Sequence, residues 1–472
     1  MSMVVQHNMQ AANANRMLGI TSGAQAKSTE KLSSGYKINR AADDAAGLTI
    51  SEKMRKQIRG LDKASSNAQD GVSSVQTAEG ALTEVHSMLQ RMNELAVQAS
   101  NGTNSSDDRS AIQDEVNQLT TEIDRVAETT KFNEIYLLKG DSNGNTKNVY
   151  MNAHDAGLKG SLTDGATTAT FKIGAGALDA GKSITIGGKD YTIGATVADG
   201  KALLGTTYDG SVKAKVNGTE YTLVANGAED ETANKLAKTK MEALIQGGAT
   251  VEVNGKSLTV MTDAKDSKGG NNPDGIDDTD SSVISAEHAV DLINNELLAA
   301  NNIGTVDQAA TMGQKPTYAS ATGATFTINK GYATVADRLS FSLHVGADAD
   351  MTNKITVDID TMNSSNLGIK GINVKDSTGT AATYAIDAIA DAVAKVSSQR
   401  SSLGAVQNRL EHTIDNLDNI SENTSSAESR IRDTDMAKEM VNYSKNNILA
   451  QAGQSMLAQA NQSNQGVLSL LQ

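Results

Sequence analysis

The sequence contains no cysteine and no tryptophan, and only two prolines and four phenylalanines occur among its 472 residues. The absence of cysteine excludes disulfide bonds, thiolate metal sites and cysteine-based catalysis. Aromatic residues make up 3% of the chain, although they normally supply much of the surface that a large globular core buries. Helix–helix contacts made by Ala, Leu, Val and Met therefore fit this composition better than one large core.

An excess of basic residues is also missing, since the formal net charge is −14 and the pI is near 5.0. Nucleic-acid binding normally needs a basic surface, so this balance argues against a general nucleic-acid-binding function. No apolar run approaches the roughly 18 residues of a transmembrane helix, and we expect no membrane span. The first ten residues lack the basic start and apolar segment of a secretory signal. We therefore expect secretion, if it occurs, to proceed without a cleaved signal peptide.

The most regular pattern in the chain is a seven-residue repeat between Leu61 and Ala99. Small or apolar residues occupy two positions of each of six heptads, which is the pattern of a helix that buries one seam against a partner helix. The first position holds Leu61, Ala68, Val75, Leu82, Leu89 and Ala96, and the second holds Ala64, Gly71, Ala78, Val85, Met92 and Ala99. A helix of roughly 40 residues is about 60 Å long, too long for an ordinary compact core to cover.

A matching seam lies near the other end of the chain. Its apolar positions repeat at threes and fours: Ile389, Val393, Val396, Leu403, Val406, Leu410, Ile414 (or Thr413), Leu417, Ile420, Ala427 and Ile431. Both prolines lie between the two seams, which leaves both ends free to form long helices. We predict a fold that is mainly α at both termini, a long antiparallel coiled-coil-like bundle that is discontinuous in sequence, with an inserted α+β, β-rich central region.

The segment between the seams changes character in two steps. A turn-rich break over Asn101–Asp108 precedes a second helix with Ile112, Val116, Leu119, Ile123 and Val126 on one face. From about residue 140 to 371 the chain is rich in Gly, Thr and Asp. Three segments place Asn-Gly or Gly-Gly between alternating arms and predict hairpins: Ile184–Ile193, Ala214–Leu223 and Val251–Val260. Helices are expected over Thr232–Ile245 and Ser285–Leu298, and a further strand pair over Leu339–Asp348 and Ile355–Ile359.

Several short motifs carry possible chemistry, but none predicts a catalytic or metal site. Gly176–Ser183 fits the phosphate-binding pattern G-x-x-x-x-G-K-[ST], yet Lys182 leads into a hairpin arm and not into a helix. Asp141–Asn145 resembles the start of an EF-hand loop but lacks its later ligands, and the acidic loop Asp274–Asp280 could hold calcium only weakly. A solvated loop is the default interpretation of both. The six histidines have no partner at a recognisable spacing. We expect no enzyme activity, no cofactor and no metal.

One charged cluster leaves two interpretations open. Lys53, Arg55, Lys56 and Arg59 follow one another on the first long helix. They form either a solvated helix face or a contact between subunits.

The two ends of the chain resemble bacterial flagellins, the subunits of the flagellar filament. The similarity covers roughly residues 3–140 and 339–472. It is carried by Leu32–Gly35, Ala42–Gly47, Asn67–Gly71, Thr77–Leu82, Leu89–Gln98, Asn101–Asn104, Glu122–Arg125 and Phe132–Asn133, and then by Glu428–Ile431, Gln451–Ala452, Met456–Asn461 and Val467–Leu471. The resemblance implies a self-assembling structural protein that serves motility.

The resemblance also implies a domain plan and a set of partners. Residues 1–40 and 436–472 would form a terminal coiled coil that lines the filament core, and 41–140 with 339–435 a helical bundle domain with a β-hairpin. Residues 141–338 would form variable α+β domains exposed on the surface. The implied partners are further copies of the chain in a helical homopolymer, a flagellar export chaperone, cap proteins and Toll-like receptor 5. The implied location is the extracellular flagellum, reached unfolded through type III export.

The resemblance places the receptor epitope on the helical region between residues 90 and 115. Its residues would be Gln90, Arg91, Glu94, Leu95, Gln98 and Glu115. The alternative is that these side chains are contacts between subunits in the filament, and both roles are compatible. For the chain as a whole, the alternatives to a filament subunit are a hook–filament junction protein and a surface adhesin. A third possibility, an enzyme domain in the middle, would need a catalytic cluster such as H-E-x-x-H, which the sequence lacks.

Overall fold

The computed structural model describes residues 8–205, 210–264, 273–376 and 378–470. The chain divides into two compact units. The first contains the residues up to Ser73, Phe341–Val357, and the residues from Ala405 onward. The second contains Ser74–Ser340 and Asp358–Gly404. Two long helices, α2 (Ala45–Ser100) and α8 (Thr380–Arg432), run through both units. The predicted fold class, with helical ends and a strand-rich insertion, is confirmed.

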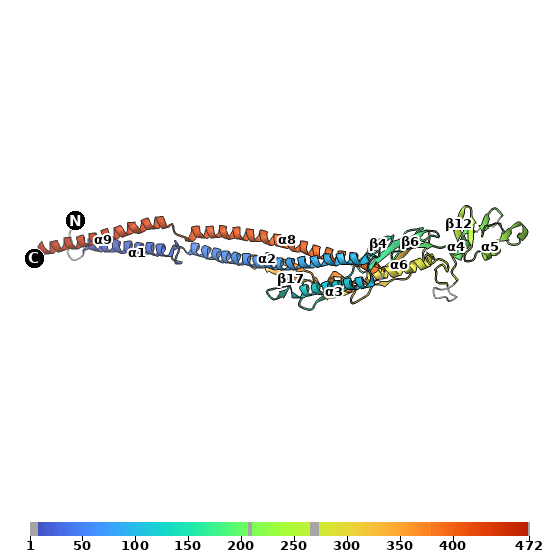
Figure 1. Ribbon diagram of the computed structural model, residues 1–472. Coiled ribbons are helices and arrows are strands. Elements are labelled where there is room, and N and C mark those ends of the chain that lie inside the picture. The colour runs from blue at the N-terminus through green and yellow to red at the C-terminus, as the bar shows by residue number, and fades with distance from the viewer. Residues whose placement is uncertain (1–7, 206–209, 265–272, 377, 471–472) are drawn as a thin grey trace. The chain divides into compact units, whose positions relative to one another are not determined.

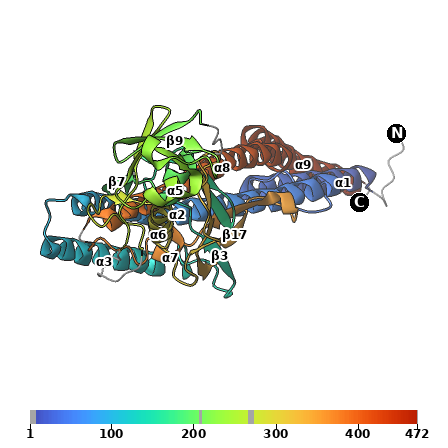
Figure 2. The ribbon, with the colours of Figure 1, turned by 90° about the vertical axis from the view of Figure 1, so that its right-hand side faces the viewer.

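The first unit is built from two antiparallel helix pairs. Helix α1 (Met9–Ser34) lies beside α9 (Met436–Leu470), and both views show this pairing (Figures 1 and 2). The start of α2 packs against the end of α8, where Leu61, Ala64 and Ala68 meet Leu410 and Leu417. The hairpin of β17 (Leu339–His344) and β18 (Lys354–Ile359) adds Val345 and Ile355 to this core.

The predicted seam of α2 is buried along its length. Leu61 is 8% exposed, and Ala68, Val75, Leu82 and Leu89 are fully buried. On α8, Leu403, Leu410 and Leu417 are buried and Val406 is half-buried. Ile420, which we expected in the same seam, is 43% exposed.

In the second unit, helix α3 (Ser106–Thr129) follows the predicted break after Ser100. Its N-terminus is a capping box, in which the Ser105 hydroxyl accepts from the Asp108 N–H and Asp108 accepts from the Ser105 N–H. The Arg109 side chain returns to α2 and donates to the Ala99 carbonyl at 3.0 Å. A short hairpin of β1 (Lys131–Phe132) and β2 (Ile135–Tyr136) comes next.

The central strands form several small sheets. One sheet has four strands in the order β14-β15-β5-β4, one has three in the order β13-β7-β6, and one has five in the order β10-β9-β8-β11-β12. Two further strands, β3 and β16, pair antiparallel. Their bounds are β3 Thr146–Tyr150, β4 Ser161–Asp164, β5 Thr168–Ile173, β6 Ser183–Ile186, β7 Lys189–Ile193, β8 Lys213–Val216, β9 Thr219–Val224, β10 Lys235–Ala237, β11 Thr250–Val253, β12 Lys256–Thr259, β13 Val283–Ile284, β14 Thr311–Met312, β15 Ala324–Asn329 and β16 Tyr332–Ala336.

Three short helices and one longer helix complete this region: α4 Val197–Leu203, α5 Lys238–Leu244, α6 Ala286–Asn301 and α7 Ser364–Leu367. Single 3₁₀ turns lie at Glu231–Ala233 and, in the first unit, at Met351–Asn353. Separate apolar cores result. One surrounds Phe171, Phe326 and Ile293, another surrounds Leu223, Met241 and Val251, and a small further one contains Met151, Ala333 and Val335. The helix expected over Thr232–Ile245 is wrong in its first half, which forms a 3₁₀ turn and then strand β10.

The three predicted hairpins are confirmed, with Gly187-Gly188, Asn217-Gly218 and Asn254-Gly255 at their turns. Both residues of each turn have positive φ, between 51° and 82°, as a two-residue type I′ turn requires.

The chain enters and leaves the central region at one point. The Asp141 N–H donates to the Asp337 carbonyl at 2.8 Å, and the Asp337 N–H donates to the Asn145 carbonyl at 2.9 Å. Gly140 has φ +92°, and an added Cβ there would lie 2.6 Å from the Asp337 carbonyl oxygen. Glycine is therefore required at this crossing.

Candidate assembly surface

The paired terminal helices leave most of their apolar side chains exposed. On α1 only Ser28 is buried, and on the part of α9 whose side chains are described only Ala450 is. The exposed fraction is 73% for Met9, 68% for Val441 and 67% for Ile448. The other large apolar side chains exposed here are Met17, Ile20, Met436, Met440, Leu449 and Met456. An apolar surface of this extent marks a region that binds another molecule.

A shallow groove runs between the two terminal helices at their outer end. It is lined by Gln10, Asn13, Ala14 and Met17 of α1 and by Gly453, Met456, Gln459 and Ala460 of α9. The small residues allow close approach, as Gly453 shows, since an added Cβ would lie 3.4 Å from Leu18. Asn8 fastens the pair: its amide oxygen caps α1 by accepting from the Ala11 N–H, and its amide nitrogen donates to the Ala460 carbonyl.

Both helix pairs are interrupted at the same level, where α1 passes into α2 and α8 passes into α9. Helix α1 ends at Gly35, which has φ +74°. The two connections pair with each other, because the Lys37 N–H donates to the Arg432 carbonyl at 2.6 Å and the Thr434 N–H donates to the Gly35 carbonyl at 3.0 Å. The junction is therefore a hydrogen-bonded crossing of two chain segments.

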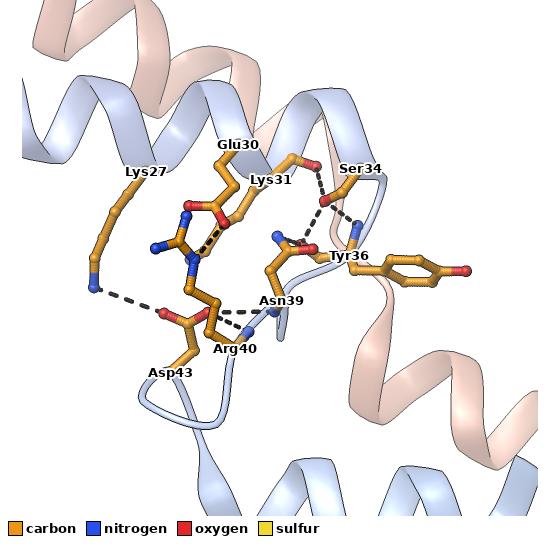
Figure 3. A network of polar contacts seen from close by, with 8 residues as sticks. All are labelled: Lys27, Glu30, Lys31, Ser34, Tyr36, Asn39, Arg40 and Asp43. Carbon is orange, nitrogen blue, oxygen red and sulfur yellow. Dashed lines mark hydrogen bonds and ion pairs between the residues drawn. The ribbon is translucent and has the colours of Figure 1, made fainter.

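Charged side chains hold the first connection in place (Figure 3). The Asp43 carboxylate accepts from the Arg40 and Asn39 N–H groups and lies 3.7 Å from the Lys27 ammonium. Arg40 reaches back to Glu30 on α1 at 2.9 Å. Hydrogen bonds from backbone N–H groups lower the pKa of Asp43, and the bond from Arg40 has a larger effect than the bond from Asn39.

Arg432 links the second connection to the first. Its guanidinium pairs with Glu52 on α2 and lies over the Tyr36 ring, 4.9 Å from the centroid. The hydrogen bond from Arg432 lowers the pKa of Glu52. Gly35 and Asp43 lie within Leu32–Gly35 and Ala42–Gly47, two of the segments that carry the resemblance, and Gly35 and Asp43-Asp44 are recognisable helix stop and start signals. The pairing of the two connections was not predicted.

Two family profiles match the helical ends. The bacterial flagellin N-terminal helical region matches residues 5–143, and the bacterial flagellin C-terminal helical region matches residues 386–471. A flagellin of Clostridium tyrobutyricum is 41% identical over 98% of this chain and 100% of its own length. The chain belongs to the bacterial flagellin family.

Further relatives agree with this assignment. A flagellin of Halalkalibacterium halodurans is 34% identical over 99% of this chain and its own full length. The similarity to the solved structure of FliC from Burkholderia pseudomallei extends over 72% of this chain and 99% of that chain at 20% identity, with a TM-score of 0.27. Flagellins are structural proteins of the flagellar filament. Among the helices that the structure describes, none is both long and apolar enough to cross a membrane.

In this flagellin, five of the six residues expected to form a receptor epitope reach the surface of the second unit. Arg91 is the centre of the group: its Nε lies 2.9 Å from Glu115 on α3, and its Nη1 lies 3.1 Å from Glu94. The hydrogen bond that Arg91 donates to Glu115 contributes most to raising the pKa of Arg91. Gln90 and Gln98 are exposed, and Glu115 is partly exposed.

Leu95 differs from the other five residues because it is 2% exposed. Its side chain is covered in this structure, and its expected place in the receptor epitope stays a prediction. Its neighbour Ala96 is also buried. The buried face of α2 is thus wider here than one heptad seam, since α3 lies against this part of the helix through Arg91 and Arg109.

The motifs that might have carried chemistry are parts of ordinary loops and turns. Gly176 and Gly181 have positive φ, and Lys182 leads directly into strand β6. The Asp141 carboxylate accepts from the Asn143 N–H and from the Asn145 amide, so it stabilises its own turn. Within the described residues, no group of three or more His, Asp or Glu side chains is placed to hold a metal ion.

The histidines of α2 and α8 differ in their exposure. His412 is exposed, whereas His86 is half-buried and its Nδ1 is buried without a partner in the described structure. The His86 Nε2 lies 3.1 Å from the Gln90 amide nitrogen.

Proposed function

We propose that this chain assembles into an extracellular flagellar filament by burying the exposed surface of α1 and α9 against further copies of itself. The observation that carries the proposal is the exposure of Met9, Val441 and Ile448 on helices that cover each other only partly. Helices with such a weak mutual seam gain most of their stability from additional packing. Copies of the chain supply that packing in a helical homopolymer.

The same feature supports the export route. Terminal helices with few buried side chains are easily unfolded and are expected to remain poorly ordered until assembly covers them. We infer that the chain travels to the filament tip unfolded through type III export, without a cleaved signal, and that an export chaperone and cap proteins attend it. The three-part domain plan remains part of this proposal: 1–40 with 436–472, 41–140 with 339–435, and 141–338.

Sedimentation and electron microscopy of the purified chain, before and after a polymerisation trigger, test the assembly proposal. We expect long filaments from the full chain and none from a chain that lacks residues 436–472. The double variant Val441→Asp/Ile448→Asp should also fail to assemble, because each charge would be buried unpaired. The matched control Leu244→Asp/Val306→Asp places the same charges at exposed apolar positions outside α1 and α9.

Two results would count against assembly through α1 and α9. A full-length chain that stays monomeric under every condition would favour the junction-protein or adhesin alternative. If Val441→Asp/Ile448→Asp formed filaments at the same protein concentration as the wild type, the exposed surface of α1 and α9 would not be part of the contact between subunits.

A second proposed function is binding of Toll-like receptor 5 through Gln90, Arg91, Glu94, Gln98 and Glu115. The supporting observation is the ion-paired group around Arg91, which fixes an Arg side chain on an exposed helix face. Arginine held in this way is a frequent centre of protein interfaces. Leu95 would support the helix from within.

A cell reporter of receptor activation tests the receptor proposal. Arg91→Ala should raise the half-maximal concentration of monomer at least about tenfold, while Glu84→Ala, at another exposed position of α2, should leave it unchanged. Thermal unfolding of both variants checks that the fold is intact. Equal responses from Arg91→Ala and the wild type would refute the epitope.

A further inference from the structure

Helix α2 carries a basic face in the first unit, and the neighbouring carboxylate of Glu52 pairs with Arg55 and Arg432. Lys53, Lys56, Arg59 and Lys63 are all exposed. Their spacing of three and four residues places them on one side of the helix. The buried residues Ser51, Leu61 and Ser65 lie on the other side. In the described part of the chain, none of the four basic residues forms an ion pair.

Helix α8 carries the complementary charge. Glu411, Asp415, Asp418 and Glu422 recur at spacings of four, three and four, and all are exposed. No Lys or Arg occurs between Glu411 and Ser429. These carboxylates also lack ion pairs within the described residues, although Asp418 accepts a hydrogen bond from Ser65 and Glu411 one from Gln407.

Each set of charges destabilises its own helix, because like charges three or four residues apart repel each other. The two sets cannot neutralise each other within one copy. Ser65 and Asp62 join α2 to α8 through Asp418 and Ser421, and the basic face lies on the opposite side of α2. Only another molecule can pair with it.

The two faces match each other in length as well as in sign. Lys53 to Lys63 spans ten residue steps and Glu411 to Glu422 eleven, or about 15–17 Å each at 1.5 Å per residue. Two parallel copies would place α2 of one antiparallel to α8 of the other, because these helices are antiparallel within the chain. Four basic residues would then face four acidic residues.

We propose that the basic face of α2 in one copy docks against the acidic face of α8 in a second copy. This inference rests on the proposed assembly into a filament and identifies a lateral contact within it. It is separate from the apolar surface of α1 and α9. Charge complementarity of this kind mainly selects the correct partner and register.

Charge reversal tests the contact. The variant Lys56→Glu/Arg59→Glu/Lys63→Glu reverses the basic face, and Glu411→Lys/Asp415→Lys/Glu422→Lys reverses the acidic face. We expect each to raise the critical concentration for assembly at least about tenfold. Combining both sets in one chain restores opposite charges across the contact and should return the critical concentration to within about threefold of the wild-type value. An equal mixture of the two single-face variants should also assemble.

Controls separate the contact from general effects of charge and folding. Lys159→Glu/Lys182→Glu/Lys256→Glu makes the same change in net charge at exposed lysines of the central region and should assemble normally. Far-UV circular dichroism verifies helix content in each variant. Wild-type filaments together with unaffected single-face variants would overturn the contact and leave the proposed function standing. Loss of assembly without rescue in the combined chain would also overturn it. A wild-type chain that never assembles would refute the proposed function itself.

Discussion

Gln113 links two segments that are far apart in the sequence. Its side chain is 6% exposed, its Nε2 donates to the Ile372 carbonyl at 2.8 Å, and its Oε1 accepts from the Val374 N–H at 2.6 Å. Ile372 and Val374 are themselves buried. The amide thus satisfies a backbone donor and a backbone acceptor that no water reaches.

Replacing this amide should be costly. Gln113→Ala leaves two buried backbone groups unpaired, so we expect the free energy of unfolding to fall by about 2–4 kcal/mol. Gln118→Ala, at an exposed position of the same helix, should change it by less than about 0.5 kcal/mol. Denaturant titration of both variants measures the difference, and equal stabilities would contradict the role of Gln113.

Asp43 should make the junction sensitive to acid. Its pKa is lowered in the folded chain by the N–H groups of Arg40 and Asn39. A lowered carboxyl pKa stabilises the folded state above the unfolded-state pKa, near 3.8, and this contribution disappears as the pH falls through the folded pKa. The amide NMR shifts of Asn39 and Arg40 should therefore change together below about pH 4. In Asp43→Asn that titration should be absent; its persistence would assign it to another group.

At the scale of elements, two glycines of α2 should respond oppositely to the same substitution. An added Cβ at Gly80 meets no atom within 4 Å, so Gly80→Ala should stabilise the helix by about 0.5–1 kcal/mol. At Gly60 it would lie 2.9 Å from the Ala347 Cβ and 3.1 Å from the Ala347 Cα. Gly60→Ala should therefore lower the melting temperature while Gly80→Ala raises it. A rise in both would mean that the loop at Ala347 yields easily.

The elements that could be predicted correctly from the sequence are those whose pattern is contained in a short segment of the chain. Asn217-Gly218 and Asn254-Gly255 adopt positive φ at both positions, and this requirement can be read from two residues. The seam from Leu61 onward repeats often enough to define a helix without knowledge of its partner. Helix α8 contains the whole second predicted seam, from Ile389 to Ile431, for the same reason.

The errors occur where a distant segment decides the structure. Asn234 takes φ +53° and ends a 3₁₀ turn, after which β10 pairs in parallel with β9, so no helix forms there. Strand β5 pairs with β15, more than 150 residues later, and no local pattern indicates that register. Leu95 is buried next to the predicted seam, whereas Ile420, which was expected in the second seam, is 43% exposed, and the heptad pattern alone indicates neither. The junction around Arg432 was missed because its partners come from both ends of the chain.

For the whole molecule, the scarcity of aromatic residues has a structural counterpart. The four phenylalanines do not form one centre: Phe171 and Phe326 share a small core, with ring centroids 6.2 Å apart. The first unit relies on aliphatic contacts such as Leu61 with Leu410 and Leu417. The terminal helices α1 and α9 bury even fewer apolar side chains. The stability of the chain thus comes from several small cores. The terminal helices bury the least apolar surface, and they are the segments proposed to bury more of it on assembly.

The backbone hydrogen bonds of Asp337 with Asp141 and Asn145 hold the two ends of the central region next to each other. Residues 142–336 can then be excised and the gap closed with a linker of a few residues, or exchanged for a foreign domain whose own termini are neighbours. The shortened chain should keep its helix content and still form filaments, as circular dichroism and electron microscopy would show. Collapse of the helical ends after excision would mean that the insert also acts as a scaffold. Otherwise a foreign domain can be inserted at this position, and the outer surface of the filament can be changed without altering the helices proposed to assemble.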